Sequence, residues 1–188
     1  MELLLIIGGV ISLIVGIYSI FRVRKEYQHA GLLSNFTVTV VWFEYIFVTL
    51  LVIASSIYAP WQIFELTGIT TLVGILLILA GIVTFSIGIA QFGSFRRMSG
   101  QDTNQLITSG IYKKSRNPQN FGWYIGLVGI AILGMSPLAL GFTLAFILLL
   151  HIYITGIEEP FLRKMYGKKF KTYMKDTSRY WAFGKSNK

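Results

Sequence analysis

The fold is decided by residues 109–126, SGIYKKSRNPQNFGWYIG, where a basic segment that faces water becomes a membrane helix. Asn117 suits the N-cap of that helix, because its side-chain oxygen can accept a hydrogen bond from a free amide of the first turn. Pro118 then takes the first helical position, where its missing N–H costs nothing. A helix that starts here places its free amides and positive dipole end beside Arg116. The stretch therefore predicts either a site for an anion or only the positively flanked start of a transmembrane helix.

Composition indicates the broad class of the protein. Of its 188 residues, 54% are hydrophobic and 13% are charged, whereas soluble domains contain about 25% charged residues. Together with long uncharged runs, this predicts an all-α, polytopic integral membrane protein in which residues 1–188 form a single membrane domain. The chain has no cysteine, and its histidines, His29 and His151, are far apart in sequence. We therefore expect no disulfide, thiol nucleophile or metal site.

Three apolar segments precede the basic stretch, at residues 3–21, 36–58 and 69–92, and each is long enough to cross the membrane. We expect the first to be a retained span and not a signal peptide, because no basic residue precedes it. Basic residues at 22–25 are expected to end it, followed by a polar loop over 26–35. Small residues recur at helical spacing in the first and third spans, which predicts close helix packing. They are Gly8, Ser12, Gly16 and Ser19, and then Gly74, Gly81 and Gly88.

Glu44 is the one charged side chain inside the second apolar segment. A carboxylate within a membrane span is costly and by default marks a pathway or a binding site. The alternative is a carboxyl group that is protonated or bonded to a neighbouring hydroxyl. We take Glu44 as a candidate substrate-binding residue.

The run from 121 to 157 contains no charged side chain and is too long for one ordinary span. Residues 134–137, Gly-Met-Ser-Pro, break it, so the sequence predicts a helical hairpin with arms at 118–133 and 138–157. The first arm has 16 residues. At ~1.5 Å per residue it is roughly 24 Å long, which is short for a hydrocarbon core of ~30 Å.

The basic residues predict the topology. All 17 Lys and Arg fall at 22–25, 96–116 and 163–188. Five spans with the N-terminus outside place all three segments in the cytoplasm, as the positive-inside rule requires. The tail after Glu159 alternates basic and aromatic residues, which is typical of an amphipathic helix on an anionic membrane surface. Nucleic-acid binding is the weaker interpretation of the net charge of +9, because topology already explains that charge.

Polar side chains meet where the two ends of the hairpin come together. Arg116 at its start should lie near Glu158 and Glu159 at its exit, and His151, Thr155 and Glu158 share one face of the last helix. A helix C-terminus disfavours carboxylates. The acid pair therefore predicts a cationic partner, which is Arg116, a lysine or a bound cation, unless the pair is merely solvated and bridged to the tail.

The same residues resemble a known family. Residues 106–112, LITSGIY, followed by Arg116-Asn117-Pro118, are similar to the entry motif of the isoprenylcysteine carboxyl methyltransferases. Residues 158–162, EEPFL, followed by Tyr166-Gly167, Phe170, Tyr173 and Arg179, resemble their C-terminal motif. The wider group includes phospholipid N-methyltransferases, and the resemblance covers roughly residues 90–181. The family's entry motif is usually Arg-His-Pro with a Tyr two residues after the Pro and then Gly-Trp. Here Asn117 and Asn120 replace the His and the Tyr, while Gly122 and Trp123 match.

The resemblance implies S-adenosylmethionine as methyl donor, bound on the cytoplasmic side by a catalytic part at residues 93–188, with residues 1–92 as three membrane helices. It implies Arg116 and Glu159 as catalytic residues and Arg116 and Trp123 as substrate-binding residues, to which the carboxylate inside the second span adds Glu44. The expected cofactor-binding residues are Tyr112, Asn117, Pro118, Asn120, His151, Glu158 and Glu159.

The resulting hypothesis is an integral-membrane methyltransferase of the cell membrane whose active site is cytoplasmic. It acts on a lipid-like or prenylated acceptor that enters from the bilayer, by carboxyl O-methylation. Methyl transfer to a carboxylate needs little acid–base chemistry, so the absence of a catalytic triad is no objection. The alternatives are phospholipid headgroup N-methylation, with Glu44, His151 or Glu159 as proton acceptor, an NADPH-dependent sterol-type reductase, and a small transporter or scaffold.

Overall fold

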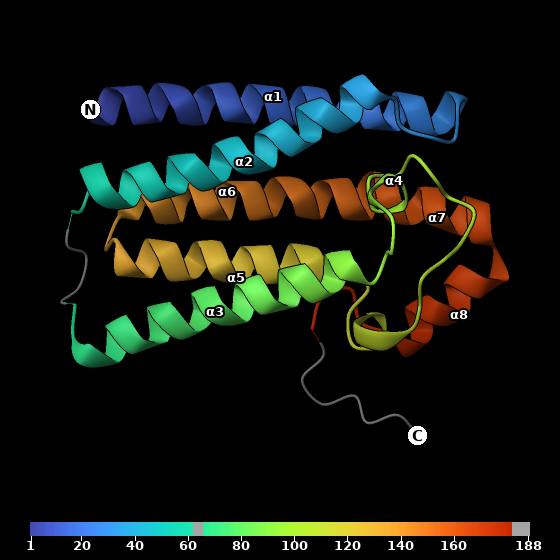
Figure 1. Cartoon of the computed structure of the whole chain (residues 1–188). Coiled ribbons are helices and arrows are strands. Elements are labelled where there is room, and N and C mark those ends of the chain that lie inside the picture. The colour runs from blue at the N-terminus through green and yellow to red at the C-terminus, as the bar shows by residue number, and fades with distance from the viewer. Residues whose placement is uncertain (62–65, 182–188) are drawn as a thin grey trace.

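The computed structural model describes residues 1–61 and 66–181, and these contain helices and no strand. Five long helices lie side by side (Figure 1). They are α1 (Glu2–His29), α2 (Asn35–Tyr58), α3 (Gly68–Ala90), α5 (Pro118–Leu133) and α6 (Pro137–Tyr153). Short elements gather at one end, namely α4 (Phe95–Met98), η1 (Gly110–Lys113), α7 (Glu159–Tyr166) and α8 (Lys168–Asp176). A π-helical turn, η2 (Ile154–Glu158), joins α6 directly to α7.

Four helices are long and apolar enough to cross a membrane: α1, α2, α3 and the continuous helix Pro137–Tyr166. The fold class is therefore confirmed as all-helical and suited to a polytopic membrane protein. The predicted number of five spans is not confirmed, because α5 has 16 residues and an ordinary span needs about 20. Large apolar side chains on α3, such as Ile69, Leu72 and Leu79, are more than half exposed, which is expected of a surface that faces lipid.

Close packing of α3 against α5 explains the glycines of the third apolar segment. Gly74, Gly81 and Gly88 are the buried residues of α3. A Cβ atom added at Gly81 would lie 2.6 Å from the carbonyl oxygen of Gly122, so only glycine permits this approach of the two backbones. Ser12, Gly16 and Ser19 of α1 are also buried, as the small-residue pattern predicted.

The first helix is longer than expected. Residues 22–25 do not end α1, which continues to His29, because Lys and Arg are good helix formers and a charged side chain only ends the apolar part. The chain turns at Gly31, whose φ of 70° is left-handed. Tyr27, which we expected in a loop, is therefore carried on α1.

Where the sequence predicted a hairpin with arms at 118–133 and 138–157, the structure has α5 and α6, joined at residues 134–136. Pro118 occupies the first turn of α5, and Asn117 stands at its N-cap, but the capping bond that we predicted is absent. The Asn117 side-chain amide instead donates to the backbone carbonyl of Arg179, at 3.4 Å. The N-cap side chain is thus used to hold the C-terminal tail.

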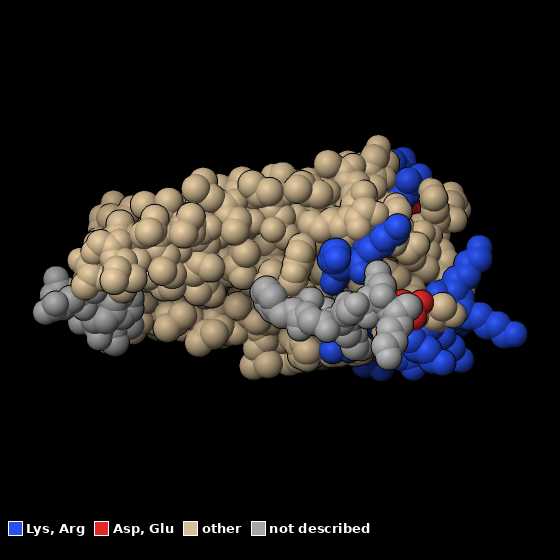
Figure 2. Space-filling view, turned by 90° about the horizontal axis from the view of Figure 1, so that it is seen from below, with Lys and Arg blue, Asp and Glu red and all other residues tan. Residues whose placement is uncertain are grey.

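The basic segments lie at one end of the molecule, as predicted. Lys and Arg gather at the end that carries the short helices, and the long apolar body lacks them on the face seen in Figure 2. Figure 1 shows that this end includes the last turns of α1, α4 and the pair α7 and α8.

The tail differs from the single membrane-bound amphipathic helix that we expected. It forms two short helices, α7 and α8, separated at Gly167, whose φ is 55°. Phe170 and Tyr173 of α8 are buried against Tyr112. The aromatic face of α8 therefore packs on Tyr112 of the basic stretch of the same chain.

Candidate functional site

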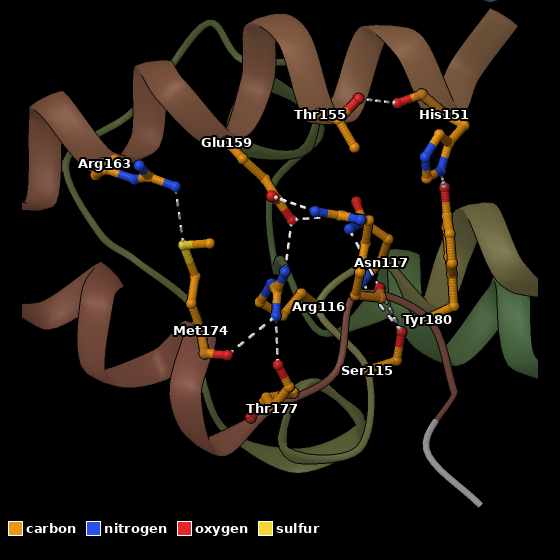
Figure 3. Close-up of polar contacts among 11 residues, drawn as sticks. Ser115, Arg116, Asn117, His151, Thr155, Glu159, Arg163, Met174, Thr177 and Tyr180 are labelled. Carbon is orange, nitrogen blue, oxygen red and sulfur yellow. Dashed lines mark hydrogen bonds and ion pairs between the residues drawn. The ribbon is translucent and has the colours of Figure 1, made fainter. Parts of the chain in front are cut away.

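Glu159 is held by two arginines at the basic end of the molecule. Its Oε1 accepts from Arg116 Nη2 at 2.6 Å and from Arg179 Nε at 2.9 Å, and its Oε2 accepts from Arg179 Nη2 at 2.8 Å. The side chains of Glu159 and Arg116 are 6% and 8% exposed. The bidentate contact with Glu159 raises the pKa of Arg179, so the guanidinium group of Arg179 stays charged. We call these three residues the clamp, and Figure 3 shows Arg116 and Glu159 directed toward one another.

The clamp fastens the tail to the start of α5. Besides its bond to Glu159, the Arg116 guanidinium donates to the backbone carbonyls of Thr177 and, at 3.4 Å, Met174 (Figure 3). The Arg116 amide donates to the carbonyl of Ser178 at 2.9 Å, and the Ser115 hydroxyl donates to that of Arg179 at 3.3 Å. A cationic partner is therefore found for one member of the acid pair, Glu159, which binds Arg116 and, from the tail, Arg179.

Tyr112 joins the helices beneath this clamp. Its hydroxyl donates to the side-chain oxygen of Gln119 at 2.8 Å and lies 3.2 Å from the carbonyl of Gly88. The Tyr173 hydroxyl donates to the backbone carbonyl of Tyr112 at 2.7 Å. Burial raises the pKa of both phenols, so they remain neutral hydrogen-bond donors. Tyr112 thus orders the segment that carries Arg116.

A cavity of about 240 Å³ opens beside the clamp and continues between the membrane helices. Its wall at the charged end includes Arg116, Glu158 and Glu159. Glu158 makes no hydrogen bond or ion pair with any residue in the described part of the chain, although Glu159 beside it makes several. Arg116 Nε is buried and also lacks a partner there. Beside the clamp, the cavity therefore offers the carboxylate of Glu158 and the Nε donor of Arg116.

The cavity wall continues into the membrane on α1, α2 and α6. Tyr27 of α1 stacks on Phe161 of α7 with ring centroids 3.9 Å apart, and both line the cavity near its charged end. Tyr45 donates to the Asn120 side-chain oxygen at 2.9 Å, and both line the middle of the wall. Glu44 lines it as well, at a position where the surrounding side chains are mostly apolar.

The structure brings together seven of the ten residues that the sequence indicated. Tyr112, Arg116, Asn117, Asn120, Glu158, Glu159 and Glu44 all line the cavity. Pro118, Trp123 and His151 do not. Trp123 packs on Tyr45 and Phe146 and donates to Thr49, and His151 Nδ1 lies 3.0 Å from the Tyr180 hydroxyl. Trp123 thus supports two residues that line the cavity, Tyr45 and Phe146.

Sequence reasoning missed three residues of the site. Arg179 belonged to the C-terminal motif but received no role, although it binds Glu159 bidentately. Tyr27 was placed in a loop. Arg97 lines the cavity, donates to the carbonyl of Phe92 at 3.2 Å, and has a buried Nε without a partner among the described residues. Only its place in a basic segment could have indicated it. In residues 1–61 and 66–181, no cluster of acidic or histidine side chains could hold a metal ion.

Comparisons with known proteins point to one enzyme group. The profile of the phospholipid methyltransferase family matches residues 69–169. A protein of Oryza sativa subsp. indica, named probable protein-S-isoprenylcysteine O-methyltransferase, is 32% identical over 108 residues, which is 54% of this chain and 55% of that protein. The protein-S-isoprenylcysteine O-methyltransferase of Dictyostelium discoideum is 34% identical over 76 residues, which is 40% of this chain and 32% of that protein. The match thus spans about half the length of the rice relative. No solved structure matches significantly.

Proposed function

Because the chain belongs to the phospholipid methyltransferase family, we propose that it is an integral-membrane methyltransferase that uses S-adenosylmethionine and methylates the carboxylate of a lipid-like or prenylated acceptor. The observation that carries this proposal is the pair of oppositely charged groups that line the cavity beside the clamp without a partner among the described residues. Glu158 offers a free carboxylate, and Arg116 Nε offers a free cationic donor.

The residues of the cavity fit the proposed cofactor. S-adenosylmethionine supplies an activated methyl group on a positively charged sulfur, and it also carries an amino group and a carboxylate. Glu158 is the cavity carboxylate that is free to bind the cationic groups, and Arg97 Nε is a donor for a carboxylate. Asn117 and Asn120 add neutral polar groups to the same wall.

The chemistry requires little more than positioning. Transfer to a carboxylate oxygen forms one C–O bond and breaks one C–S bond, and no proton has to move. The chain therefore has to bind the donor and the acceptor, align them and exclude water, and these effects together can supply most of the rate. Arg116 Nε can hold the acceptor carboxylate while Nη1 and Nη2 remain fixed by the tail and Glu159. In this role Glu159 orients Arg116 and does not touch the acceptor.

Amine N-methylation of a phospholipid headgroup is the second candidate, favoured by the description of the matching family. That reaction must remove a proton from nitrogen. Of the proton acceptors expected from the sequence, Glu159 is held by two guanidinium groups, His151 lies outside the cavity, and Glu44 lies in its apolar part, away from the charged end. Glu158 would have to serve instead. Comparing carboxylate and amine acceptors with the purified protein separates the two reactions.

The test of cofactor binding is the substitution Glu158→Gln. A charge-assisted hydrogen bond is worth about 1.5–3 kcal/mol, so we expect S-adenosylhomocysteine to bind roughly 10- to 100-fold more weakly. Isothermal titration of the detergent-solubilised protein measures this, with NADPH as the ligand expected not to bind. Glu2→Gln, the same change at the far end of the molecule, is the matched control. Unchanged binding by Glu158→Gln, or binding of NADPH alone, would contradict the proposal.

A further inference from the structure

Glu44 has no role in the methyl-transfer step proposed above. It lies on α2, is 4% exposed, and lines the cavity. The hydroxyl of Ser12 on α1 donates to its Oε1. Its other oxygen, Oε2, is buried and has no hydrogen-bond partner among the described residues. A buried polar atom without a partner costs free energy in a protein and more in a membrane. We therefore expect a ligand to hydrogen-bond with this atom.

Glu44 lies well away from the charged end. A Cβ atom added at Gly16 of α1 would lie 3.8 Å from Glu44 Oε1, so these residues share one level of the cavity. Tyr27 of α1, which stacks on Phe161, marks the level of the clamp. The 11 residues from Gly16 to Tyr27 correspond to roughly 16 Å of helix. A small cofactor group bound at Glu158 is therefore too far away to contact Glu44. The chain of an acceptor that extends into the membrane can reach it.

The surroundings of Glu44 are apolar. Ile20, Val41, Phe146 and Leu149 line the cavity with it, and Ser19 is bonded to its own helix backbone at 2.8 Å. A hydrocarbon chain fits this wall but leaves Oε2 unsatisfied. A hydroxyl group on the chain would satisfy it in either protonation state, because a hydroxyl can both donate and accept a hydrogen bond.

We propose that Glu44, positioned by Ser12, is the acceptor-specificity residue of this protein, and that it recognises a hydroxyl group carried on the apolar chain of the acceptor. This inference rests on the proposed function, because it names the class of lipid that enters the same cavity. It predicts that a hydroxylated lipid is a better acceptor than a purely hydrocarbon chain such as an unmodified prenyl group.

The experiment uses the full chain in lipid nanodiscs with labelled S-adenosylmethionine. The acceptors are carboxylated lipids of equal chain length, one without a hydroxyl and a series with one hydroxyl at successive positions. We expect the parent protein to prefer one hydroxyl position by at least about tenfold in kcat/KM, mainly through KM, since a hydrogen bond to a charged group is worth about that factor. Glu44→Leu should abolish the preference, and Glu44→Gln and Ser12→Ala should retain part of it.

Thr143→Val is the matched control, because Thr143 is fully buried on α6, bonds only to the carbonyl of Ala139, and does not line the cavity. It should keep the preference. Equal use of all acceptors by the parent protein, or a preference that survives in Glu44→Leu, overturns the inference while the proposed function stands. If no acceptor is methylated and S-adenosylhomocysteine does not bind, the proposed function itself fails. If S-adenosylhomocysteine binds but no acceptor is methylated, native mass spectrometry measures how much of each lipid stays bound to the protein. Equal retention of the hydroxylated and the plain lipid then overturns the inference.

Discussion

The two ends of the cavity treat a buried carboxylate in opposite ways. At the charged end, Glu159 has three hydrogen bonds from two guanidinium groups, and at the membrane end, Glu44 has one from a serine hydroxyl. Both residues are buried to a similar degree, at 5% and 4% exposed. Ion pairs offset the burial of Glu159, and no charge offsets that of Glu44. The Glu159 carboxylate therefore stabilises the fold, whereas the Glu44 carboxylate, in our proposal, binds a ligand.

The comparison extends to the family match. Residues 69–169 include Glu158 and Glu159 but exclude α1 and α2, and thus Ser12 and Glu44. We expect the chemistry of methyl transfer to reside in the matched part and the choice of acceptor to depend on the two N-terminal helices. Variants at the two ends of the cavity should therefore change different properties of the protein.

The largest effect is expected when the clamp is broken. Glu159→Ala leaves two guanidinium groups without their carboxylate, and removing one member of a buried ion pair costs about 3–5 kcal/mol. Arg116→Ala should cost a similar free energy of unfolding. The double variant Glu159→Ala/Arg116→Ala should lose about 1–3 kcal/mol less stability than the sum of the two single variants. Chemical unfolding in mixed micelles measures the three values, and additivity within about 0.5 kcal/mol would show that the pair is not coupled.

A smaller effect is expected at the other end. Glu44→Leu removes an unsatisfied buried carboxyl and its bond to Ser12, and Ser12 can then donate to its own helix backbone. These changes oppose one another, so the free energy of unfolding should move by less than about 1 kcal/mol, in contrast to Glu159→Ala. The same unfolding titration checks this. A loss comparable to that of Glu159→Ala would mean that Glu44 is structural, and the contrast between the two ends would disappear.

The smallest effect on stability is expected from cysteines on the exposed surface, which also test the orientation of the two ends. The chain has no native cysteine. Leu66 and Lys114 are exposed and lie at opposite ends of the molecule, so Leu66→Cys and Lys114→Cys should change stability by no more than about 0.5 kcal/mol. We propose that the basic end is cytoplasmic. An impermeant thiol reagent added to intact cells should then label Leu66→Cys only, and the reverse pattern would invert the topology. The topology predicted from the sequence suggests Gln62 on the outer side and Ser186 in the tail for the same labelling test. Both lie beyond the described residues, so Leu66 and Lys114 are used in their place.

The positions of the long apolar helices and of the turn between α5 and α6 could be predicted without a structure, because charge and the length of apolar runs are local properties of the sequence. Residues 36–58 and 69–92 closely match α2 and α3, and the break at 134–137 is where predicted. The glycine spacing in α3 also indicated a packed face, since a seven-residue repeat returns to the same side of a helix. The motif positions of Arg116 and Glu159 indicated a shared site before any contact was visible.

The side chains that line the cavity could not be predicted in this way. Lipid tails and protein interiors are equally apolar, so an uncharged helix sequence does not distinguish its lipid face from its inner face. Trp123 and His151 consequently do not line the cavity, whereas Tyr27 does. The clamp joins Arg116, Glu159 and Arg179, and the pairing of Glu44 with Ser12 joins two helices. Such contacts depend on helix rotation and on the path of the tail, which packing of the whole chain sets.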